Sequence, residues 1–263
     1  MKAGQRLWTR DELVLAVNLY CKLTFGKMHQ GNPDIIRLAA IIGRTPGSVS
    51  RKLTNFASLD PSLHARQIKG STNRGTLDAQ IWDEFYDRWE DVAFESEALL
   101  AKYTGVTVEA IALSPAEQSE ETFVLVEGKE RERLVKIRVN QSFFRKTVLA
   151  AYNNTCCITG LRQPQLLVAG HILRWSDSAE NRMNPRNGLA LTPLFDRAFE
   201  LGYVTITPDY LVKVASEFRK KRPDPAAVEY QLLSYDQQKI RLPGKFLPDP
   251  VFLQQHNDTR FRG

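Results

Sequence analysis

Cysteine is scarce in this chain of 263 residues, which contains only Cys21, Cys156 and Cys157. An odd number of cysteines, two of them adjacent, cannot form a disulfide framework, and no CxxC pair is present to bind zinc. We therefore expect reduced, structural thiols. Long apolar runs are also missing: no segment approaches the roughly 18 residues that a membrane span requires, and MKAGQRLWTRDEL lacks the apolar centre of a secretory signal. These absences predict an intracellular, cytoplasmic protein with no membrane partner.

The composition is that of a globular protein, because 43% of the residues are hydrophobic and 25% are charged. At about 100 to 200 residues per domain, the length favours two modest domains over one large one. The predicted organisation is a helical domain over residues 1–101, a linker with a possible strand pair over 102–139, and a mixed domain over 140–263. The expected strand pair is TFVLVEG and RLVKIRV, which have short alternating patterns.

Charge is distributed unevenly along the helical half. The net charge of the chain is +6, and between residues 37 and 74 seven cationic residues stand against Asp60 alone. The stretch from Asp78 to Glu97 is the reverse, with eight acidic residues and only Arg88 as a cation. The basic stretch is compatible with a polyanionic partner, and the acidic one should face away from it. The alternative for the acidic stretch is an ordinary solvated face.

Apolar residues recur at helical spacing through the first hundred residues. Thr9 is positioned to cap the first helix, and Pro33 and Pro46 suit the first turns of two others. The four expected helices lie in residues 9–23, in PDIIRLAAIIG, in RTPGSVSRKLTNFASLDP and, from about Ala79, in IWDEFYDRWEDVAFESEALLAKY. Further along the chain we expect a helix near 193–201 and a hairpin in YVTITPDYLVKVA.

Ala39, Gly43 and Val49 have the spacing AxxxGxxxxxV, which resembles the helix-turn-helix of DNA-binding proteins. In the second helix of this pair, Val49, Leu53 and Phe56 would face the core. The polar residues of the predicted outer stripe, suited to phosphates and base edges, are Ser48, Arg51, Lys52 and Asn55. The alternative is a purely structural helix pair, since any tight turn can need a glycine.

The segment CCITGLRQPQLLVAGHILRWSDSAENRMNPRNGLALTPLFDRAFELGYVTI carries the most specific pattern. Its CCITG turn, GHI, NGL and LFDRAFELG resemble the HNH endonucleases, nucleases with a ββα-metal site, and in particular the variant that occurs in restriction enzymes. The resemblance covers about residues 143–206, and the N-terminal helical half also resembles the region that accompanies this variant. It implies an α+β protein with a helical, helix-turn-helix-like N-terminal domain and a C-terminal ββα-metal HNH nuclease domain.

The resemblance implies roles for three residues. His171 matches the general base that activates water, Asn187 matches the residue that orders the site, and Asp196 matches a metal ligand. Many relatives carry an aspartate immediately before the histidine as a further ligand, whereas this chain has Gly170. A hard oxygen ligand such as Asp196 suits Mg²⁺ or Mn²⁺. The cations expected to bind phosphates near the site are Arg174, Arg186 and Arg197.

These residues also have a structural interpretation. His171 would then be a structural histidine and Asn187 a turn residue, while Asp196 would cap a helix or pair with an arginine and Arg197 would be a surface charge. The ordered set of motifs nevertheless favours a metal-dependent endonuclease acting on double-stranded DNA in restriction or defence. The alternatives are a DNA-binding regulator with an inactive HNH-like domain, and a structural adaptor. Because a double-strand cut needs two hydrolyses, either a homodimer or sequential nicking by one active site is a further expectation. His256 lies in a terminal segment, FLQQH, expected to pack on the nuclease domain.

Overall fold

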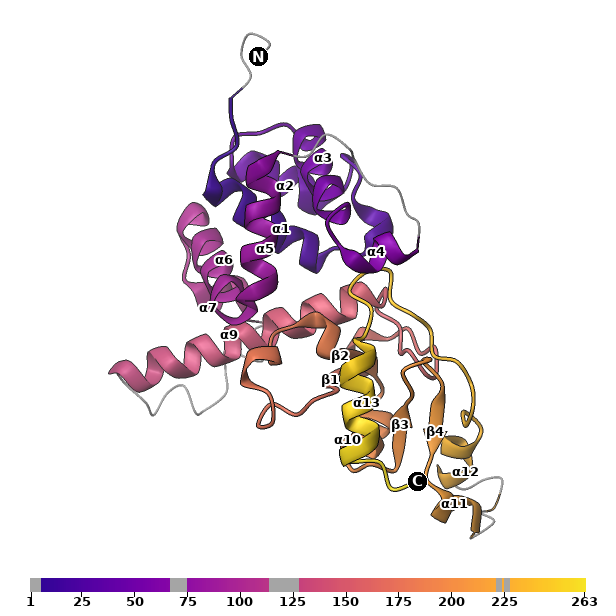
Figure 1. Cartoon of the computed structure of the whole chain (residues 1–263). Helices are drawn as coiled ribbons and strands as arrows, with labels where there is room; N and C mark the ends of the chain where they lie inside the picture. Colours follow the sequence, from indigo (N-terminus) through magenta and orange to yellow (C-terminus); the bar gives the residue numbers. More distant parts are fainter. Residues whose placement is uncertain (1–5, 67–74, 114–127, 221–223, 225–227) are drawn as a thin grey trace. The chain divides into compact units, whose positions relative to one another are not determined.

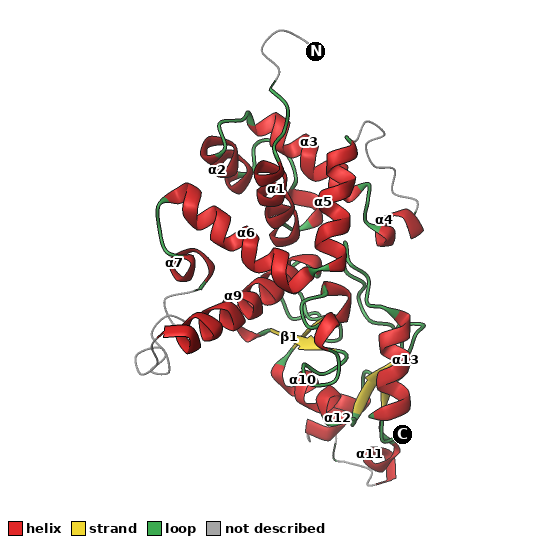
Figure 2. Ribbon diagram, turned by 60° about the vertical axis from the view of Figure 1, so that its left-hand side comes forward, coloured by secondary structure: helices red, strands yellow, loops and turns green. Residues whose placement is uncertain are grey.

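The computed structural model describes residues 6–66, 75–113, 128–220, 224 and 228–263. The chain forms two compact units, residues 1–146 and 147–263, and the boundary between them falls inside one long helix. The protein is α+β: the first unit is helical, and the strands of the described ranges belong to the second (Figure 2). None of the helices in these ranges combines the length and the apolar character that a membrane span needs.

The α-helices of the first unit are labelled in Figure 1. They are α1 (Arg10–Lys22), α2 (Pro33–Ile41), α3 (Pro46–Ala57), α4 (Pro61–Ala65), α5 (Thr76–Asp87), α6 (Trp89–Thr104), α7 (Val108–Ala112) and most of α9 (Gly128–Ala151). A 3₁₀ turn (Phe25–Lys27) lies between α1 and α2.

Helix α1 is the centre of the first unit. The predicted cap is confirmed, because the Glu12 N–H donates to the Thr9 hydroxyl at 3.3 Å while the Glu12 carboxylate accepts from the Thr9 N–H at 3.0 Å. Helices α2, α3, α5 and α6 all pack against α1, which explains why its apolar residues are buried on nearly every side. Tyr20 and Trp82 meet edge to face with ring centroids 5.6 Å apart.

Helices α2 and α3 are joined by a tight connection that contains Gly43. Its φ of 64° lies in the left-handed region that favours glycine, and Thr45 then caps α3 by accepting from the Ser48 N–H at 3.2 Å. The residues predicted to face the core, Val49, Leu53 and Phe56, have no exposed surface. The predicted turn between two helices is therefore present.

The single helix expected from Ala79 is two helices in the structure. Arg88 leaves the helical conformation, with φ −134° and ψ 49°, and separates α5 from α6. The break allows Trp89 to be buried with its ring edge-on to Phe85, at a centroid distance of 5.9 Å. The prediction of one helix was wrong because neither glycine nor proline marks this break in the sequence.

The expected strand RLVKIRV is also wrong, since residues 133–139 are helical and lie within α9. Val135 and Val139, one helical turn apart, pack into a buried cluster with Ala112 and Leu113. The alternation of apolar and charged residues was thus misleading, and the burial of positions four apart determines the structure here. The expected partner strand, TFVLVEG, lies outside the described residues except for Gly128, where α9 begins.

The second unit contains two antiparallel strand pairs. Its strands and helices are β1 (Val168–His171), β2 (Gly188–Leu191), α10 (Pro193–Glu200), β3 (Val204–Ile206), β4 (Val212–Val214), α11 (Ser216–Lys220), α12 (Val228–Leu233) and α13 (Pro250–Thr259), with 3₁₀ turns at Pro164–Leu166, Ala179–Asn181 and Pro185–Asn187. In the first pair Val168 faces Leu191 and His171 faces Gly188. Helix α10 packs on β1, β2 and β3, so that β1, β2 and α10 form a ββα unit.

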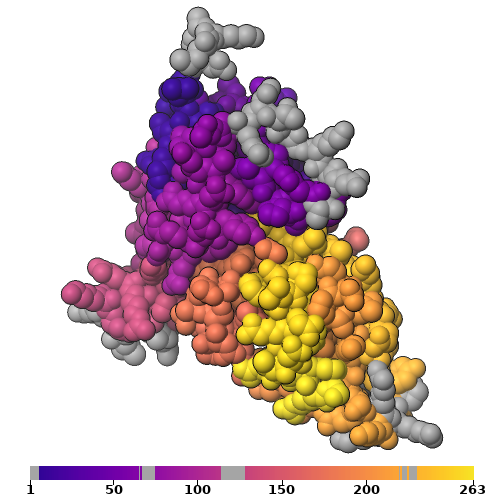
Figure 3. Space-filling model, in the orientation of Figure 1, coloured from indigo at the N-terminus to yellow at the C-terminus, as the bar shows by residue number. Residues whose placement is uncertain are grey.

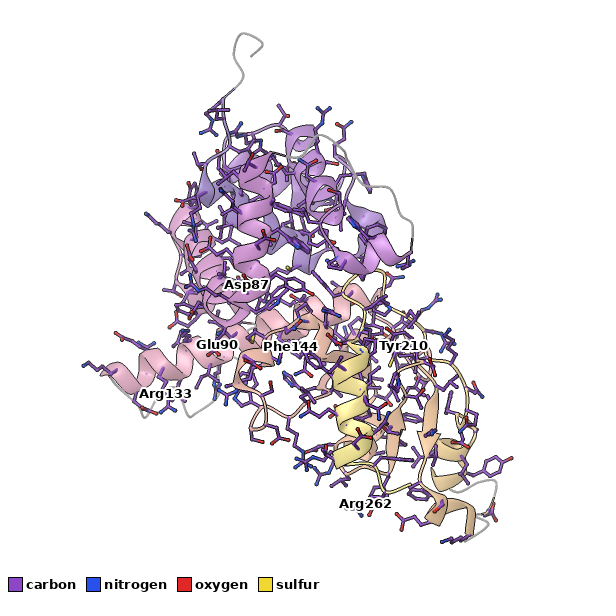
Figure 4. The ribbon with its side chains drawn as sticks, in the orientation of Figure 1. Asp87, Glu90, Arg133, Phe144, Tyr210 and Arg262 are labelled. Carbon is purple, nitrogen blue, oxygen red and sulfur yellow. The ribbon has the colours of Figure 1, made fainter. Side chains whose placement is uncertain are left out.

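The C-terminal segment packs on the same unit, as predicted. Residues of α13 (yellow in Figure 3) lie against β3, where His256 Nδ1 is 2.8 Å from the Thr205 hydroxyl. The predicted helix near 193–201 and the hairpin in YVTITPDYLVKVA are confirmed as α10 and the β3–β4 pair. Beyond α13, the Arg262 guanidinium lies 4.5 Å from the centroid of the Tyr203 ring (Figure 4). All three cysteines are buried.

Candidate active site

The ββα unit places His171 and Asp196 on one pocket. His171 is the last residue of β1, and Asp196 lies in the first turn of α10, which starts directly after β2. Both side chains line a pocket of about 520 Å³, together with Arg174, Trp175 and Glu200. The residues that the motif resemblance assigns to base and metal ligand are therefore brought together.

The imidazole of His171 is held through Nε2, which lies 2.9 Å from the main-chain oxygen of Arg182. A carbonyl oxygen can only accept, so Nε2 carries the proton and the basic lone pair of the neutral ring is on Nδ1. Burial lowers the pKa of His171 below its usual value, although the bond to Arg182 opposes this shift. The ring is accordingly neutral, and therefore basic, at neutral pH.

The loop between β1 and β2 holds the Arg182 carbonyl in place. The Arg182 side chain folds back, its Nε donates to the main-chain oxygen of Trp175 at 2.7 Å, and its guanidinium lies 5.2 Å from the Trp175 ring centroid. Trp175 in turn presents an edge-on contact to His171, with centroids 5.8 Å apart. Sequence reasoning missed Trp175 and Arg182, because their contact joins residues seven apart in an irregular loop.

Asn187 has a structural role in this loop. Its Oδ1 accepts from the Leu173 N–H at 2.7 Å, and its Nδ2 donates to the main-chain oxygens of Leu173 and Asn181, both at 3.1 Å. The side chain has no exposed surface and does not line the pocket. Asn187 is thus a positioning residue that joins the two ends of the loop, as a residue that orders the site would.

Asp196 is partly buried in the pocket wall. Burial raises the pKa of its carboxyl group, and the negative charge of Glu200, one turn further along α10, raises it further, while Arg197 lowers it. A cation at this carboxylate would relieve the same unfavourable charge. Glu200, which belongs to the LFDRAFELG motif, also lines the pocket, although the sequence analysis assigned it no role.

The three predicted phosphate-binding arginines separate in the structure. Arg174 lines the pocket and donates to the main-chain oxygen of Glu200 at 2.9 Å. Arg197 is 63% exposed and pairs with the Glu200 carboxylate at 2.6 Å. Arg186 pairs with Asp249 at 2.9 Å, and of the three predicted arginines it is Arg174 that lines the pocket.

The predicted DNA-binding stripe of α3 is only partly on the surface. Arg51 is exposed and Ser48 is half-buried. Asn55, in contrast, is 2% exposed and donates to Asp78 at 2.8 Å, and Lys52 lies 2.6 Å from the same buried carboxylate. The prediction that Asn55 and Lys52 lie on an exposed outer stripe is therefore wrong. Both contact the buried carboxylate of Asp78, a residue that the sequence analysis placed in the acidic stretch.

At the C-terminal end of the acidic stretch, another carboxylate is buried in the core. Glu97 is 1% exposed, forms an ion pair with Lys22 and accepts from the Asn18 amide at 2.9 Å. The stretch from Asp78 to Glu97 is thus not a uniform solvated face.

The residues of the pocket fit a hydrated hard cation with few protein ligands. Within the described ranges no group of three His, Cys, Asp or Glu side chains is arranged to hold a metal ion. Mg²⁺ needs no such group, because it keeps several waters and is commonly bound through one or two carboxylates together with substrate phosphates. Asp196, partly buried in a pocket large enough for such an ion and its waters, is the residue that meets this description.

Comparison with known families agrees with the geometry. Residues 156–207, which contain β1, β2, α10 and β3, match the family described as HNH endonuclease. The resemblance of this segment to the HNH endonucleases is thereby confirmed, and the second unit carries an HNH endonuclease domain. No curated protein matches the chain.

Proposed function

We propose that the protein is a metal-dependent DNA endonuclease that acts in restriction or defence against foreign DNA. The observation that carries this proposal is the hydrogen bond from His171 Nε2 to the Arg182 carbonyl, because it fixes a neutral tautomer whose basic atom is Nδ1. A base of this kind shares its pocket with a carboxylate suited to a hard cation. The HNH match supports a nuclease and a nucleic acid substrate.

In the proposed reaction, His171 Nδ1 accepts a proton from a water molecule as the water oxygen forms a bond to phosphorus. The bond between phosphorus and the leaving ester oxygen breaks, and that oxygen is then protonated from solvent. Mg²⁺ or Mn²⁺, held by Asp196, would stabilise the charge on the scissile phosphate and on the leaving oxygen. Arg174, which lines the same pocket, would contact a neighbouring phosphate.

The helical unit would contact double-stranded DNA through α3, with Arg51 and Ser48 as the exposed part of the contact surface. The tight α2–α3 turn at Gly43 supports this assignment, since it gives the two helices the connection of a helix-turn-helix. A homodimer would supply the second active site that a double-strand cut requires.

The test is incubation of supercoiled plasmid with the purified protein and Mg²⁺ or Mn²⁺. We expect nicked or linear DNA from the wild type and from His29→Ala, a control at an exposed histidine in the first unit. His171→Ala should leave the plasmid supercoiled. Because restriction enzymes can depend on base modification, modified and unmodified DNA are both included, and the ends are sequenced.

One observation favours the alternative of a DNA-binding regulator with an inactive HNH-like domain: Gly170 stands at the position where the HNH resemblance leads us to expect a further metal-binding aspartate. That function predicts salt-dependent DNA binding without strand cleavage under any of these conditions. Wild-type protein that cuts no plasmid but binds it would support the regulator and contradict the nuclease.

A further inference from the structure

We propose that Gly170 is a positioning residue for Asp196: the missing side chain at position 170 leaves the space in which the Asp196 carboxylate lies beside the base. This inference rests on the proposed role of Asp196 as the metal-binding carboxylate. It concerns a departure from the HNH pattern noted in the sequence, the glycine at the position where the resemblance leads us to expect an aspartate.

The geometry at this point is restrictive. A Cβ atom on Gly170 would be 2.2 Å from Oδ1 of Asp196 and 3.3 Å from Cδ1 of Leu191. A separation of 2.2 Å is far inside van der Waals contact, so any side chain at position 170 displaces the carboxylate. The distance to Leu191 is tight but involves the end of a flexible side chain.

Space, and not backbone conformation, is the reason for the glycine. Gly170 is not among the residues with positive φ, and it pairs with Leu189 within the regular β1–β2 ladder. An L-residue could adopt this backbone without strain. What excludes it is the carboxylate that α10 presents to the strand.

The backbones on both sides are fixed, so neither can easily withdraw. Strand β1 is held by β2, and α10 is anchored by the buried side chains of Phe195, Ala198 and Phe199. The Asp196 N–H also donates to the Thr192 carbonyl at 2.9 Å. An added methyl group must therefore be accommodated by rotation of the Asp196 side chain away from its place in the pocket.

It follows that the carboxylate in the space next to position 170 is supplied by Asp196. In this chain it reaches the space beside His171 from the helix, and an aspartate on the strand would compete for the same volume. Gly170 is thus not simply a lost ligand but the residue that makes room for the remaining one.

Gly170→Ala tests the inference, because it adds one methyl group and removes no ligand. Mn²⁺ binding is measured by electron paramagnetic resonance of the free ion, and thermal unfolding is measured alongside. We expect the Kd for Mn²⁺ to rise about 10- to 100-fold, as when a supporting residue of a metal site is lost. The melting temperature should also fall. Gly26→Ala is the control, since no atom lies within 4 Å of its added Cβ, and it should change neither quantity.

The double variant Gly170→Ala/Asp196→Ala makes the result specific. If the methyl group acts through Asp196, the double variant should bind Mn²⁺ as weakly as Asp196→Ala alone and not more weakly. The added methyl should also lower the melting temperature less in the Asp196→Ala background than in the wild type.

Several results would overturn the inference. Wild-type Mn²⁺ affinity in Gly170→Ala would do so, as would losses that simply add in the double variant. A wild type that binds no Mn²⁺, or an Asp196→Ala variant that binds it normally, would overturn the proposed function and the positioning role with it. The unfolding measurements would then still report separately whether the Gly170–Asp196 contact limits the side chain at position 170.

Discussion

The ammonium group of Lys52 lies 2.6 Å and 2.9 Å from the two carboxylate oxygens of Asp78, whose side chain is completely buried. Asn55 donates to the same carboxylate, and so does the main-chain N–H of Gly75. Arg51, the neighbour of Lys52 in the sequence, is exposed. Two adjacent cations on α3 therefore have different environments: Lys52 balances a buried charge, and Arg51 is exposed.

This difference predicts opposite outcomes for two alanine variants. Lys52→Ala leaves a buried carboxylate without its cation and should destabilise the helical unit by about 3 kcal/mol. Arg51→Ala should leave stability unchanged and lower the slope of log K against log salt concentration for DNA binding by about one. Denaturant unfolding and DNA binding at several salt concentrations measure the two effects. If Arg51→Ala leaves the salt slope unchanged, α3 is not the DNA-contacting helix.

Alanine substitution of His171 and of Asp196 should impair cleavage in different ways. His171→Ala should keep Mn²⁺ affinity and lose cleavage by about 10² to 10⁴-fold, the contribution of a positioned base. Asp196→Ala should lose Mn²⁺ affinity and regain part of its cleavage at high Mn²⁺ concentration, because mass action refills a weakened site. Cleavage assayed across a Mn²⁺ titration separates the two. Rescue of His171→Ala but not of Asp196→Ala would show that the roles are reversed.

Cleavage should depend on pH through His171. Burial lowers the pKa of this residue, so the midpoint of the acid limb should lie below 6.5. The imidazole must be neutral to accept a proton, so activity should be complete at pH 7 and decline about tenfold per unit once the pH is below the midpoint. Single-turnover cleavage rates from pH 5 to 8 measure this profile. A midpoint above 7 would be incompatible with the buried, uncharged ring.

Replacement of Asn187 should mainly lower the stability of the second unit, because its side chain does not line the pocket. Asn187→Ala removes the partners of the Leu173 N–H and of two carbonyl groups, and we expect the second unit to lose about 3 kcal/mol. Asn181→Ala is the matched control, because it keeps the main-chain oxygen that Asn187 uses and removes only half-buried side-chain bonds to Ser178 and Asn184. Denaturant unfolding of both variants provides the comparison. Equal stability of the two variants would contradict the positioning role of Asn187.

Because of His256, the free energy of unfolding should decrease as the pH is lowered. Burial lowers its pKa to about 4, whereas the unfolded chain has the ordinary value near 6.5. Because the unfolded state binds the proton more readily, the free energy of unfolding decreases as the pH falls from about 6.5 to about 4, with about 2 kcal/mol lost by pH 5. The measurement is denaturant unfolding at pH 7 and pH 5 for the wild type and for His256→Gln. The variant should lose correspondingly less, and an equal loss would contradict the prediction.

The sequence predicted those parts of the fold and site that local patterns determine. Thr9 capped its helix, Gly43 adopted the left-handed turn, and the order of His171, Asn187 and Asp196 in three short motifs was enough to place the ββα unit. In each of these cases the determining partners lie within a few residues or belong to a motif whose spacing is itself the signal.

The errors arose where distant residues decide. Asn55 was predicted to lie on the surface, but its side chain is hydrogen-bonded to the carboxylate of Asp78, which is 23 positions away in the sequence. Residues 133–139 alternate like a strand, but the cluster with Ala112 and Leu113 requires helical spacing. The carboxylate that fills the space at Gly170 comes from another element and could not be inferred from the glycine alone.

The acceptor that orients His171 is a peptide oxygen, and every amino acid at position 182 would present the same atom. The orientation of the His171 ring is therefore encoded in the path of the main chain, and the side chain of residue 182 affects it only through the contacts with Trp175 that help to hold this path. A substitution there changes the packing on Trp175 but leaves the acceptor in the chain. Sequence changes in this loop that preserve its path would therefore leave His171 Nε2 facing the same acceptor.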